Sequence, residues 1–158
     1  MYLQFGALKL STGQSFISNF NSTINHMEGE KKKILIVDDD NFLLDMYALK
    51  FSQSNFEVYT APGGVEAIEK LKGGLSPDLI LMDIIMPEMD GFEMLEKINK
   101  ENLSSKSIKI ILSNKSEQQD IDRGNELGVA GYIVKANSTP REVIEQVNNI
   151  LSQKATTI

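Results

Sequence analysis

Residues 79–91 have the sequence Leu-Ile-Leu-Met-Asp-Ile-Ile-Met-Pro-Glu-Met-Asp-Gly, and this stretch decides the fold. A short apolar run bounded by turn residues is typical of a strand buried on both faces of a parallel sheet. The run ends in Asp83, without a turn residue between them. Ligands of open α/β sheets bind at the carboxyl ends of the strands, so Asp83 is the first candidate functional residue. The plainer alternative is that Asp83 only starts a turn.

The rest of the chain alternates short β-branched or apolar runs with segments of helical periodicity. Five such pairs in strict alternation predict an α/β fold, a doubly wound parallel sheet with helices on both faces. Right-handed crossovers favour the strand order 2-1-3-4-5, a flavodoxin-like three-layer sandwich. The predicted strands are 34–37, 56–60, 78–82, 108–112 and 131–134, and the predicted helices are about 41–53, 65–72, 91–99, 116–127 and 140–152.

Several helix ends carry capping signals. Asp40 and Asp90 are suitable N-caps, and Thr139 with Glu142 forms a capping box around a proline at the first helical position. Gly128 is placed to end the fourth helix. That helix has few large apolar residues, so it is the weakest of the five.

Composition excludes several function classes. The 158 residues are 41% hydrophobic and 24% charged, carry a formal net charge of -6 and contain no cysteine. The acidic balance argues against a direct nucleic-acid partner. The absence of cysteine excludes disulfides, a thiol nucleophile and Cys-ligated metals. No apolar run reaches the roughly 18 residues that a membrane span needs, so we expect a cytoplasmic protein without membrane attachment.

Three regions are expected. Residues 1–30, rich in Ser and Asn, read as a disordered or loosely docked extension, and Met27 is an alternative start. Residues 31–153 form the folded domain, and residues 154–158 form a tail.

Polar residues follow the strands at the centre of the predicted sheet. Asp38 and Asp39 follow the first strand, Asp83 the third, Ser113 the fourth and Lys135 the fifth. Neighbouring strands lie about 4.8 Å apart, so the three carboxylates crowd together. Their repulsion calls for a hard, oxygen-ligated cation, and Mg²⁺ (or Mn²⁺) fits best. The lysine adds a second positive charge and the hydroxyl a hydrogen-bond donor.

This set of groups suits phosphoryl chemistry. The cation and the lysine neutralise phosphoryl oxygens, and the central carboxylate can attack phosphorus to form an acyl phosphate. A cluster of carboxylates that only cap helices is the alternative, and Asp40 fits it.

The chain resembles the receiver domain of two-component response regulators, close in size to the single-domain chemotaxis type. The resemblance covers residues 33–153 and rests on Ile-Leu-Ile-Val-Asp-Asp-Asp (34–40), residues 78–91, Ile-Ile-Leu-Ser (110–113) and Gly-Tyr-Ile-Val-Lys (131–135). It implies that Asp83 accepts a phosphoryl group from a histidine of a sensor kinase. It also implies that Asp38, Asp39 and the main-chain carbonyl of Ile85 hold the metal with Asp83.

The resemblance assigns the remaining roles too. Ser113 would bond the phosphoryl group after the change of state, Lys135 would pair with it, and Tyr132 would be the rotating aromatic of the output face. Tyr132 equally suits a half-buried strand position. Two positions depart from the family pattern: Ala136 replaces the usual Pro, which predicts a trans bond with a shifted loop or a strained cis bond, and Asn114 replaces a small residue.

The expected output surface is the fourth helix, the fifth strand and the fifth helix. No effector domain follows residue 153, so a stand-alone regulator is expected. Its partners would be a kinase or phosphotransfer protein and a downstream effector protein, with a phosphorelay step or a phosphorylation-dependent homodimer as other outputs. The protein would not be an enzyme beyond its own phosphorylation and dephosphorylation.

Three alternatives stay open. A haloacid-dehalogenase-like phosphatase also has Asp-x-Asp after a strand, here Asp38 and Asp40, but Phe42 and the absence of a later acidic motif disagree with that family. A flavodoxin-like flavin carrier would need a phosphate loop where the carboxylates lie. A phosphorylation-independent interaction module of the same fold is the third.

Overall fold

The computed structural model describes residues 29–157 of the chain, and the expectations placed on residues 1–28 lie outside it. The described residues contain a five-stranded parallel sheet in the order β2-β1-β3-β4-β5. This confirms the predicted doubly wound topology, with β2 at one edge. The strands are β1 (Lys32–Val37), β2 (Phe56–Ala61), β3 (Leu79–Met82), β4 (Ile108–Ser113) and β5 (Gly131–Val134).

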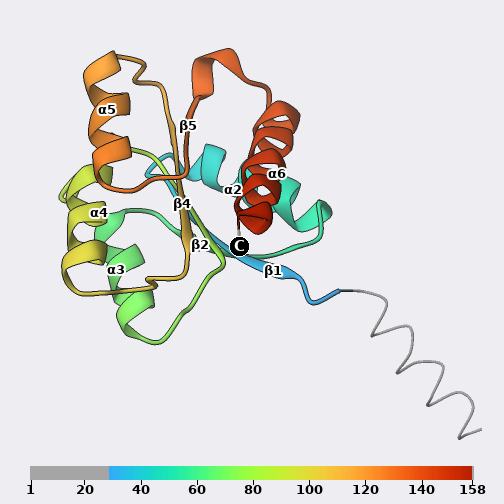
Figure 1. Ribbon diagram of the computed structural model, residues 1–158, viewed down its shortest axis with the longest axis horizontal. Helices are drawn as coiled ribbons and strands as arrows, with labels where there is room; N and C mark the ends of the chain where they lie inside the picture. Colours follow the sequence, from blue (N-terminus) through green and yellow to red (C-terminus); the bar gives the residue numbers. More distant parts are fainter. Residues whose placement is uncertain (1–28, 158) are drawn as a thin grey trace, which may run out of the picture. The chain divides into compact units, whose positions relative to one another are not determined.

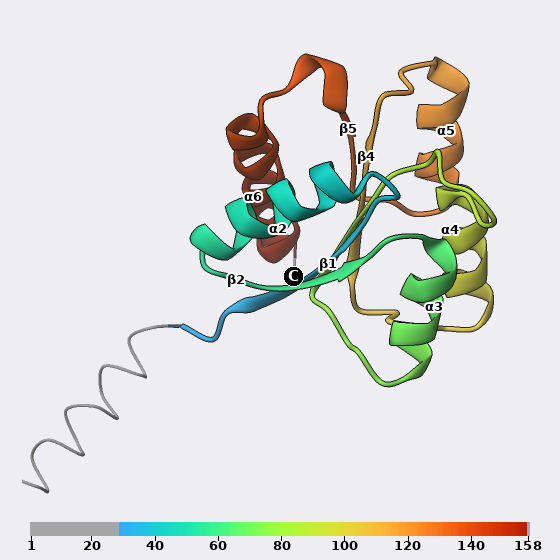
Figure 2. The same cartoon turned by 180° about the vertical axis from the view of Figure 1, so that it is seen from behind.

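Helices cover both faces of the sheet. Figures 1 and 2 show α2 and α6 on one face and α3, α4 and α5 on the other. Their bounds are α2 (Asn41–Gln53), α3 (Gly64–Lys72), α4 (Gly91–Lys100), α5 (Gln118–Glu126) and α6 (Pro140–Thr156), with a short 3₁₀ helix η1 (Lys135–Asn137) between β5 and α6. None of these helices is both long enough and apolar enough for a bilayer crossing.

The core consists of two apolar layers, one on each side of the sheet. Successive strand residues point to opposite faces. Leu35 and Val37 therefore pack under α3 and α4, whereas Ile34 and Ile36 pack under α2 and α6. All four residues of β3 are buried, as expected for the central strand of such a sheet.

The capping predictions are confirmed. The side chain of Asp40 accepts from the first turn of α2, and Asp90 and Thr139 form capping boxes at α4 and α6. Gly128 follows α5 with a φ of 84°. Two helix limits were wrong. The first helical residue of α5 is two positions later than predicted, because Glu117 has an extended conformation and is the N-cap. The last turn of α6 continues to Thr156 and is exposed.

Strand register places the candidate site. Val37 pairs with Met82, so the residues that follow them, Asp38 and Asp83, leave the sheet side by side. Ser113 pairs with Val134 at the neighbouring strand ends, and Lys135 follows at once. The carboxyl edge of the sheet therefore collects the polar residues that the sequence placed at strand ends.

Candidate functional site

Three carboxylates meet at the carboxyl edge of the sheet. Asp38, Asp39 and Asp83 each offer one oxygen, and these oxygens lie within 4.8 Å of one another. Asp38 and Asp83 are buried, whereas Asp39 is exposed. They border an open cleft of about 300 Å³, whose full lining is Asp38, Asp39, Asp40, Leu43, Asp83, Ile85, Asn114 and Lys135. The predicted acid cluster therefore lies in a solvent-accessible cleft.

The carboxylate of Asp83 is held from two sides. Its Oδ1 accepts hydrogen bonds from the amides of Ile84 (2.6 Å) and Ile85 (3.3 Å), which belong to the loop after β3. Its Oδ2 accepts from Lys135 Nζ at 2.9 Å. A further hydrogen bond fixes this loop to the start of α4, because the amide of Gly91 donates to the Ile84 carbonyl at 2.9 Å. The carboxylate that follows β3 thus has a fixed orientation toward the cleft.

Lys135 bridges the two buried carboxylates. Its Nζ lies 2.5 Å from Asp38 Oδ2, and its side chain is almost fully buried. Burial lowers the pKa of Lys135, but the bonds to Asp38 and Asp83 outweigh it, so the pKa is raised. Burial raises the pKa of Asp38, and the bond to Lys135 offsets this only in part. The lysine is therefore a fixed positive charge within the cleft.

The donor set suits a hard divalent cation. The three clustered carboxylates outnumber the single ammonium of Lys135, so the site has an excess of negative charge that a divalent cation would reduce. Hard cations such as Mg²⁺ prefer carboxylate and carbonyl oxygens together with water, and the exposed Asp39 leaves room for water. The residues present therefore fit the predicted metal.

Ser113 and Tyr132 are not part of the lining of this cleft, but both are hydrogen-bonded to the loop after β4. Ser113 is fully buried, and its Oγ accepts a hydrogen bond from the amide of Lys115 at 3.3 Å. The hydroxyl of Tyr132 donates to the main-chain carbonyl of the same Lys115 at 3.1 Å. Burial, followed by the nearby carboxylates of Asp120 and Glu117, raises the pKa of Tyr132 to about 12. The tyrosine is therefore a neutral hydrogen-bond donor at pH 7.

The two departures from the family pattern have structural consequences. No cis peptide bond occurs in residues 29–157, so the bond to Ala136 is trans, and the chain continues as the 3₁₀ turn η1. The trans bond is the one expected in the first of the two outcomes at Ala136, and the shift of the loop stays a prediction. Asn114 lines the acid cleft and also an adjoining cavity of about 340 Å³ next to Tyr47.

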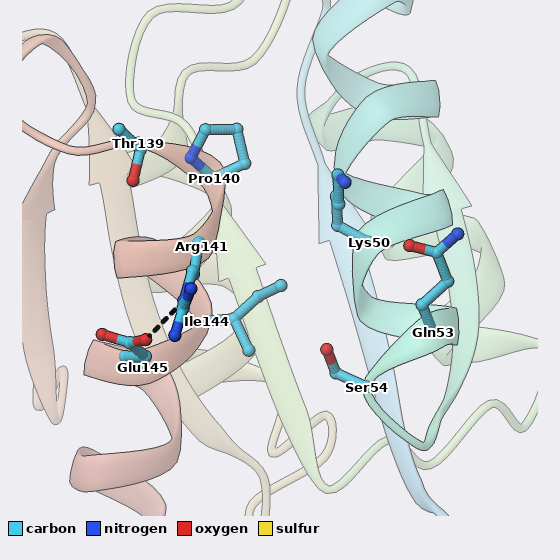
Figure 3. Close-up of a pocket in the computed structure, with 8 residues that line it drawn as sticks. All are labelled: Lys50, Gln53, Ser54, Thr139, Pro140, Arg141, Ile144 and Glu145. Atoms are coloured by element: carbon cyan, nitrogen blue, oxygen red, sulfur yellow. Dashed lines mark hydrogen bonds and ion pairs between the residues drawn. The ribbon is translucent and has the colours of Figure 1, made fainter.

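A larger cavity of about 490 Å³ lies between α2 and the start of α6 (Figure 3). Lys50 and Gln53 border it from α2, and Arg141 and Ile144 from α6. Arg141 forms an exposed ion pair with Glu145, which also borders this cavity. None of the predicted site residues lines this cavity. Size alone therefore does not mark the functional site of this fold.

Comparison with known families decides what this arrangement is. Residues 34–148 match the response regulator receiver domain family. The chain belongs to this family. A receiver domain is a signalling domain rather than an enzyme in the usual sense, and it works in two-component systems. The family assignment sets aside the dehalogenase-like phosphatase and the flavin carrier.

Relatives and solved structures agree with this assignment. The receiver domain is 36% identical over 120 residues to the alkaline phosphatase synthesis transcriptional regulatory protein PhoP of Bacillus subtilis, and 31% identical to the response regulator SaeR of Staphylococcus aureus. The alignments cover 76% of this chain and 48% and 50% of those proteins. The chain thus spans about half the length of these curated relatives.

Solved receiver structures share the fold. A CheY-like receiver domain protein from Methanospirillum hungatei aligns with a TM-score of 0.72 at 30% identity, covering 81% of this chain and 99% of that one. The chemotaxis protein CheY4 of Vibrio cholerae aligns with a TM-score of 0.70 at 25% identity, covering 76% and 98%. The CheY-like, flavodoxin-like fold predicted from the sequence is confirmed. Receiver domains bind Mg²⁺ in an acidic pocket and pair with histidine kinases and effectors, and this chain has the acidic cluster.

Sequence reasoning missed two residues beside the site. Lys115, two positions after Ser113, is hydrogen-bonded through its main chain to both Ser113 and Tyr132. Its ammonium group lies 3.6 Å from Asp120, a buried carboxylate in the first turn of α5. A charged residue in the first turn of a weak helix looks like a solvated position, so no local pattern marked Asp120 as buried.

Proposed function

We propose that this receiver domain accepts a phosphoryl group on Asp83 from a histidine of a sensor kinase or phosphotransfer protein. One observation carries the proposal: Asp83 Oδ2 faces the cleft beside the buried ammonium of Lys135 and two further carboxylates. A nucleophilic carboxylate next to fixed positive charge is the arrangement that phosphoryl transfer to an aspartate requires.

The proposed transfer forms one bond to phosphorus and breaks another. An Asp83 carboxylate oxygen attacks phosphorus and forms an acyl phosphate, while the bond between phosphorus and the donor imidazole nitrogen breaks. The imidazole keeps the electron pair of that bond and takes a proton from solvent. Lys135 neutralises oxygen charge on the phosphoryl group from its place 2.9 Å from Asp83. As the acyl phosphate forms, the hydroxyl of Ser113 donates a hydrogen bond to a phosphoryl oxygen.

Asp38, Asp39 and the main-chain carbonyl of Ile85 are the proposed protein ligands of Mg²⁺ or Mn²⁺, together with Asp83. When bound, the ion would neutralise phosphoryl oxygens and reduce repulsion within the cluster. Asp38 is oriented for such a role because its Oδ1 accepts the Asp40 amide at 3.0 Å.

A protein donor fits the rim of the cleft. Ile85 lines the cleft with 55% of its surface exposed, and Phe42, in the first turn of α2, is 77% exposed. The exposed apolar side chain of Ile85 at the cleft would be covered by a protein donor but not by a small phosphate compound. The proposed partner is therefore the histidine-bearing protein itself.

The proposed output is a change in the surface formed by α5, β5 and α6. Phosphorylation adds a charge of about -1.5 to -2 at pH 7, which would attract the hydroxyl of Ser113 and the ammonium of Lys135. Only Asp120 and Gly124 of α5 are buried, so this helix has little apolar anchorage and can shift at low cost. A downstream effector or a second phosphorylated copy would bind there. The stand-alone organisation and the boundaries expected from the sequence stay predictions.

The test is intact mass after incubation with acetyl phosphate, with and without Mg²⁺. Wild type should gain one phosphoryl group only with Mg²⁺, and Asp83→Asn should gain none. Asp45→Asn is the matched control, since it makes the same change at an exposed position of α2 outside the cleft and should leave the gain intact. No gain by wild type under any condition would contradict the proposal and favour the phosphorylation-independent interaction module.

A further inference from the structure

The main chain of Lys115 connects Ser113 and Tyr132, the two residues that were predicted to respond to phosphorylation. Its amide donates to Ser113 Oγ at 3.3 Å, and its carbonyl accepts from Tyr132 Oη at 3.1 Å. A hydroxyl has one proton to donate and two lone pairs to accept with. Because the Lys115 amide uses a lone pair of Ser113, the hydroxyl proton stays available for another acceptor. The position of one residue therefore sets the orientation of both side chains.

The side chain of Lys115 is tied to α5 by Asp120. Its Nζ lies 3.6 Å from Asp120 Oδ1, within ion-pair range. Asp120 is 7% exposed, and its Oδ2 is buried without a hydrogen-bond partner in the part of the chain that the structure describes. Burying a carboxylate oxygen in this way is costly. The ion pair between Lys115 and Oδ1 offsets part of that cost.

We propose that Asp120 is a positioning residue for phosphoryl transfer: through its ion pair with Lys115 it holds the loop after β4 so that Ser113 can donate toward Asp83 and Tyr132 stays bonded to that loop. The inference rests on the proposed function of Asp83. It adds two residues, Asp120 and Lys115, to those that act on the phosphoryl group, neither of them in contact with it.

A purely structural role is the competing explanation. Asp120 lies in the first turn of α5, where a negative charge favours the helix dipole by itself. The two explanations differ in one respect. A helix-stabilising role acts whether or not Ser113 has a hydroxyl, whereas a positioning role disappears once the hydroxyl is removed.

The experiment is therefore a double-mutant cycle on the rate of phosphorylation by acetyl phosphate with Mg²⁺. Asp120→Asn and Lys115→Met should each slow the mass gain about threefold to tenfold, the range expected for coupled neighbours. Lys115→Arg, which keeps the ion pair, should retain the wild-type rate within about twofold. In a Ser113→Ala background, Asp120→Asn should cause no further slowing. Equal slowing in both backgrounds, or none in either, would overturn the inference.

Asp122→Asn is the matched control. Asp122 lies in the same helix, and its replacement by asparagine removes the same charge. Its side chain is exposed, and its Oδ1 accepts a hydrogen bond from Gln118 at 2.8 Å. Its phosphorylation rate should stay at the wild-type value. A rate as low as that of Asp120→Asn would assign the effect to the charge of α5 and refute the positioning role.

Amide hydrogen exchange separates failure of this inference from failure of the proposed function. The Lys115 amide reports its bond to Ser113 directly, with no phosphoryl group present. Asp120→Asn should speed exchange at Lys115 by about threefold or more, and Asp122→Asn should not. If wild type takes up no phosphoryl group, the proposed function fails, and unchanged exchange at Lys115 would independently refute the link from Asp120 to the loop.

Discussion

Lys135 Nζ lies 2.9 Å from Asp83 Oδ2, although 52 positions separate the two residues along the chain. The contact exists because parallel strands end at the same edge of the sheet, β3 before Asp83 and β5 before Lys135. It places a buried positive charge beside the proposed nucleophile. The charge offsets part of the negative charge of the acid cluster, and in the proposed transfer it would neutralise oxygens of the incoming phosphoryl group.

Replacing Lys135 by methionine should therefore slow phosphorylation by acetyl phosphate about a hundredfold, the usual loss when one preorganised charge-stabilising group is removed. Intact mass measured over time with Mg²⁺ gives the rate. Lys154→Met, the same change of charge at an exposed position of α6, should react like wild type. A Lys135→Met rate within threefold of wild type would show that the ammonium has no role in the transfer.

The sequence was sufficient for the fold and for most of the cleft. Short apolar runs located all five strands, and the residues after them located Asp38, Asp39, Asp83 and Lys135, because strand ends are local features that topology then brings together. It was not sufficient for contacts between the loop after β4 and α5. The ion pair of Lys115 with Asp120 depends on how a polar helix is seated, and periodicity says little about a helix with so few apolar residues.

The exposed carboxylate of Asp39 allows the metal site to be tested without disturbing the core. Mg²⁺ at about ten times its dissociation constant should raise the free energy of unfolding of wild type by about 1.4 kcal/mol. In Asp39→Asn this gain should be largely lost, since one of three charged ligands is missing. Without Mg²⁺ the variant should be at least as stable as wild type, because repulsion in the cluster is lower.

Urea unfolding with and without Mg²⁺ measures this effect. Asp45→Asn is the control, because it removes an exposed charge of α2 that does not line the cleft and should keep the full gain. An equal gain in Asp39→Asn and wild type would exclude Asp39 from the metal site.

Gly91 allows α4 to begin against the main chain of the loop after β3. A Cβ built on Gly91 would lie 2.3 Å from the carbonyl oxygen of Asp83 and 2.9 Å from Ile84 Cα. Both are backbone atoms that cannot rotate away, so Gly91→Ala should lower the free energy of unfolding by about 2–3 kcal/mol. It should also slow phosphorylation, since the loop that orients Asp83 has to move.

The control for this steric argument is Gly73→Ala at the end of α3. There the nearest atom to an added Cβ is the Glu69 carbonyl at 3.3 Å, so a small adjustment suffices. Chemical denaturation should show a loss at Gly91 that exceeds any change at Gly73 by more than 1 kcal/mol. Similar stability of the two variants would mean that the loop after β3 is more pliable than its contacts indicate.

The buried side chain of Lys109, on β4, should make the free energy of unfolding depend on pH. Its side chain is buried, and Nζ donates to the Ser104 carbonyl at 3.2 Å. Burial lowers the pKa of Lys109 from its ordinary value of 10.5. Just below that value the folded protein therefore binds fewer protons than the unfolded chain, so stability rises with pH across this window. At neutral pH the full cost of burying the charge remains.

Lys109→Met keeps the unbranched apolar stem and removes the charge. The free energy of unfolding of the variant minus that of wild type should therefore be greatest near neutral pH and should shrink as the pH approaches about 10.5. Urea unfolding at several pH values between these limits gives the difference. Lys106→Met, at an exposed position in the same connection between α4 and β4, should show no such trend. A difference for Lys109→Met that is constant or grows with pH would mean that its ammonium is not penalised by burial.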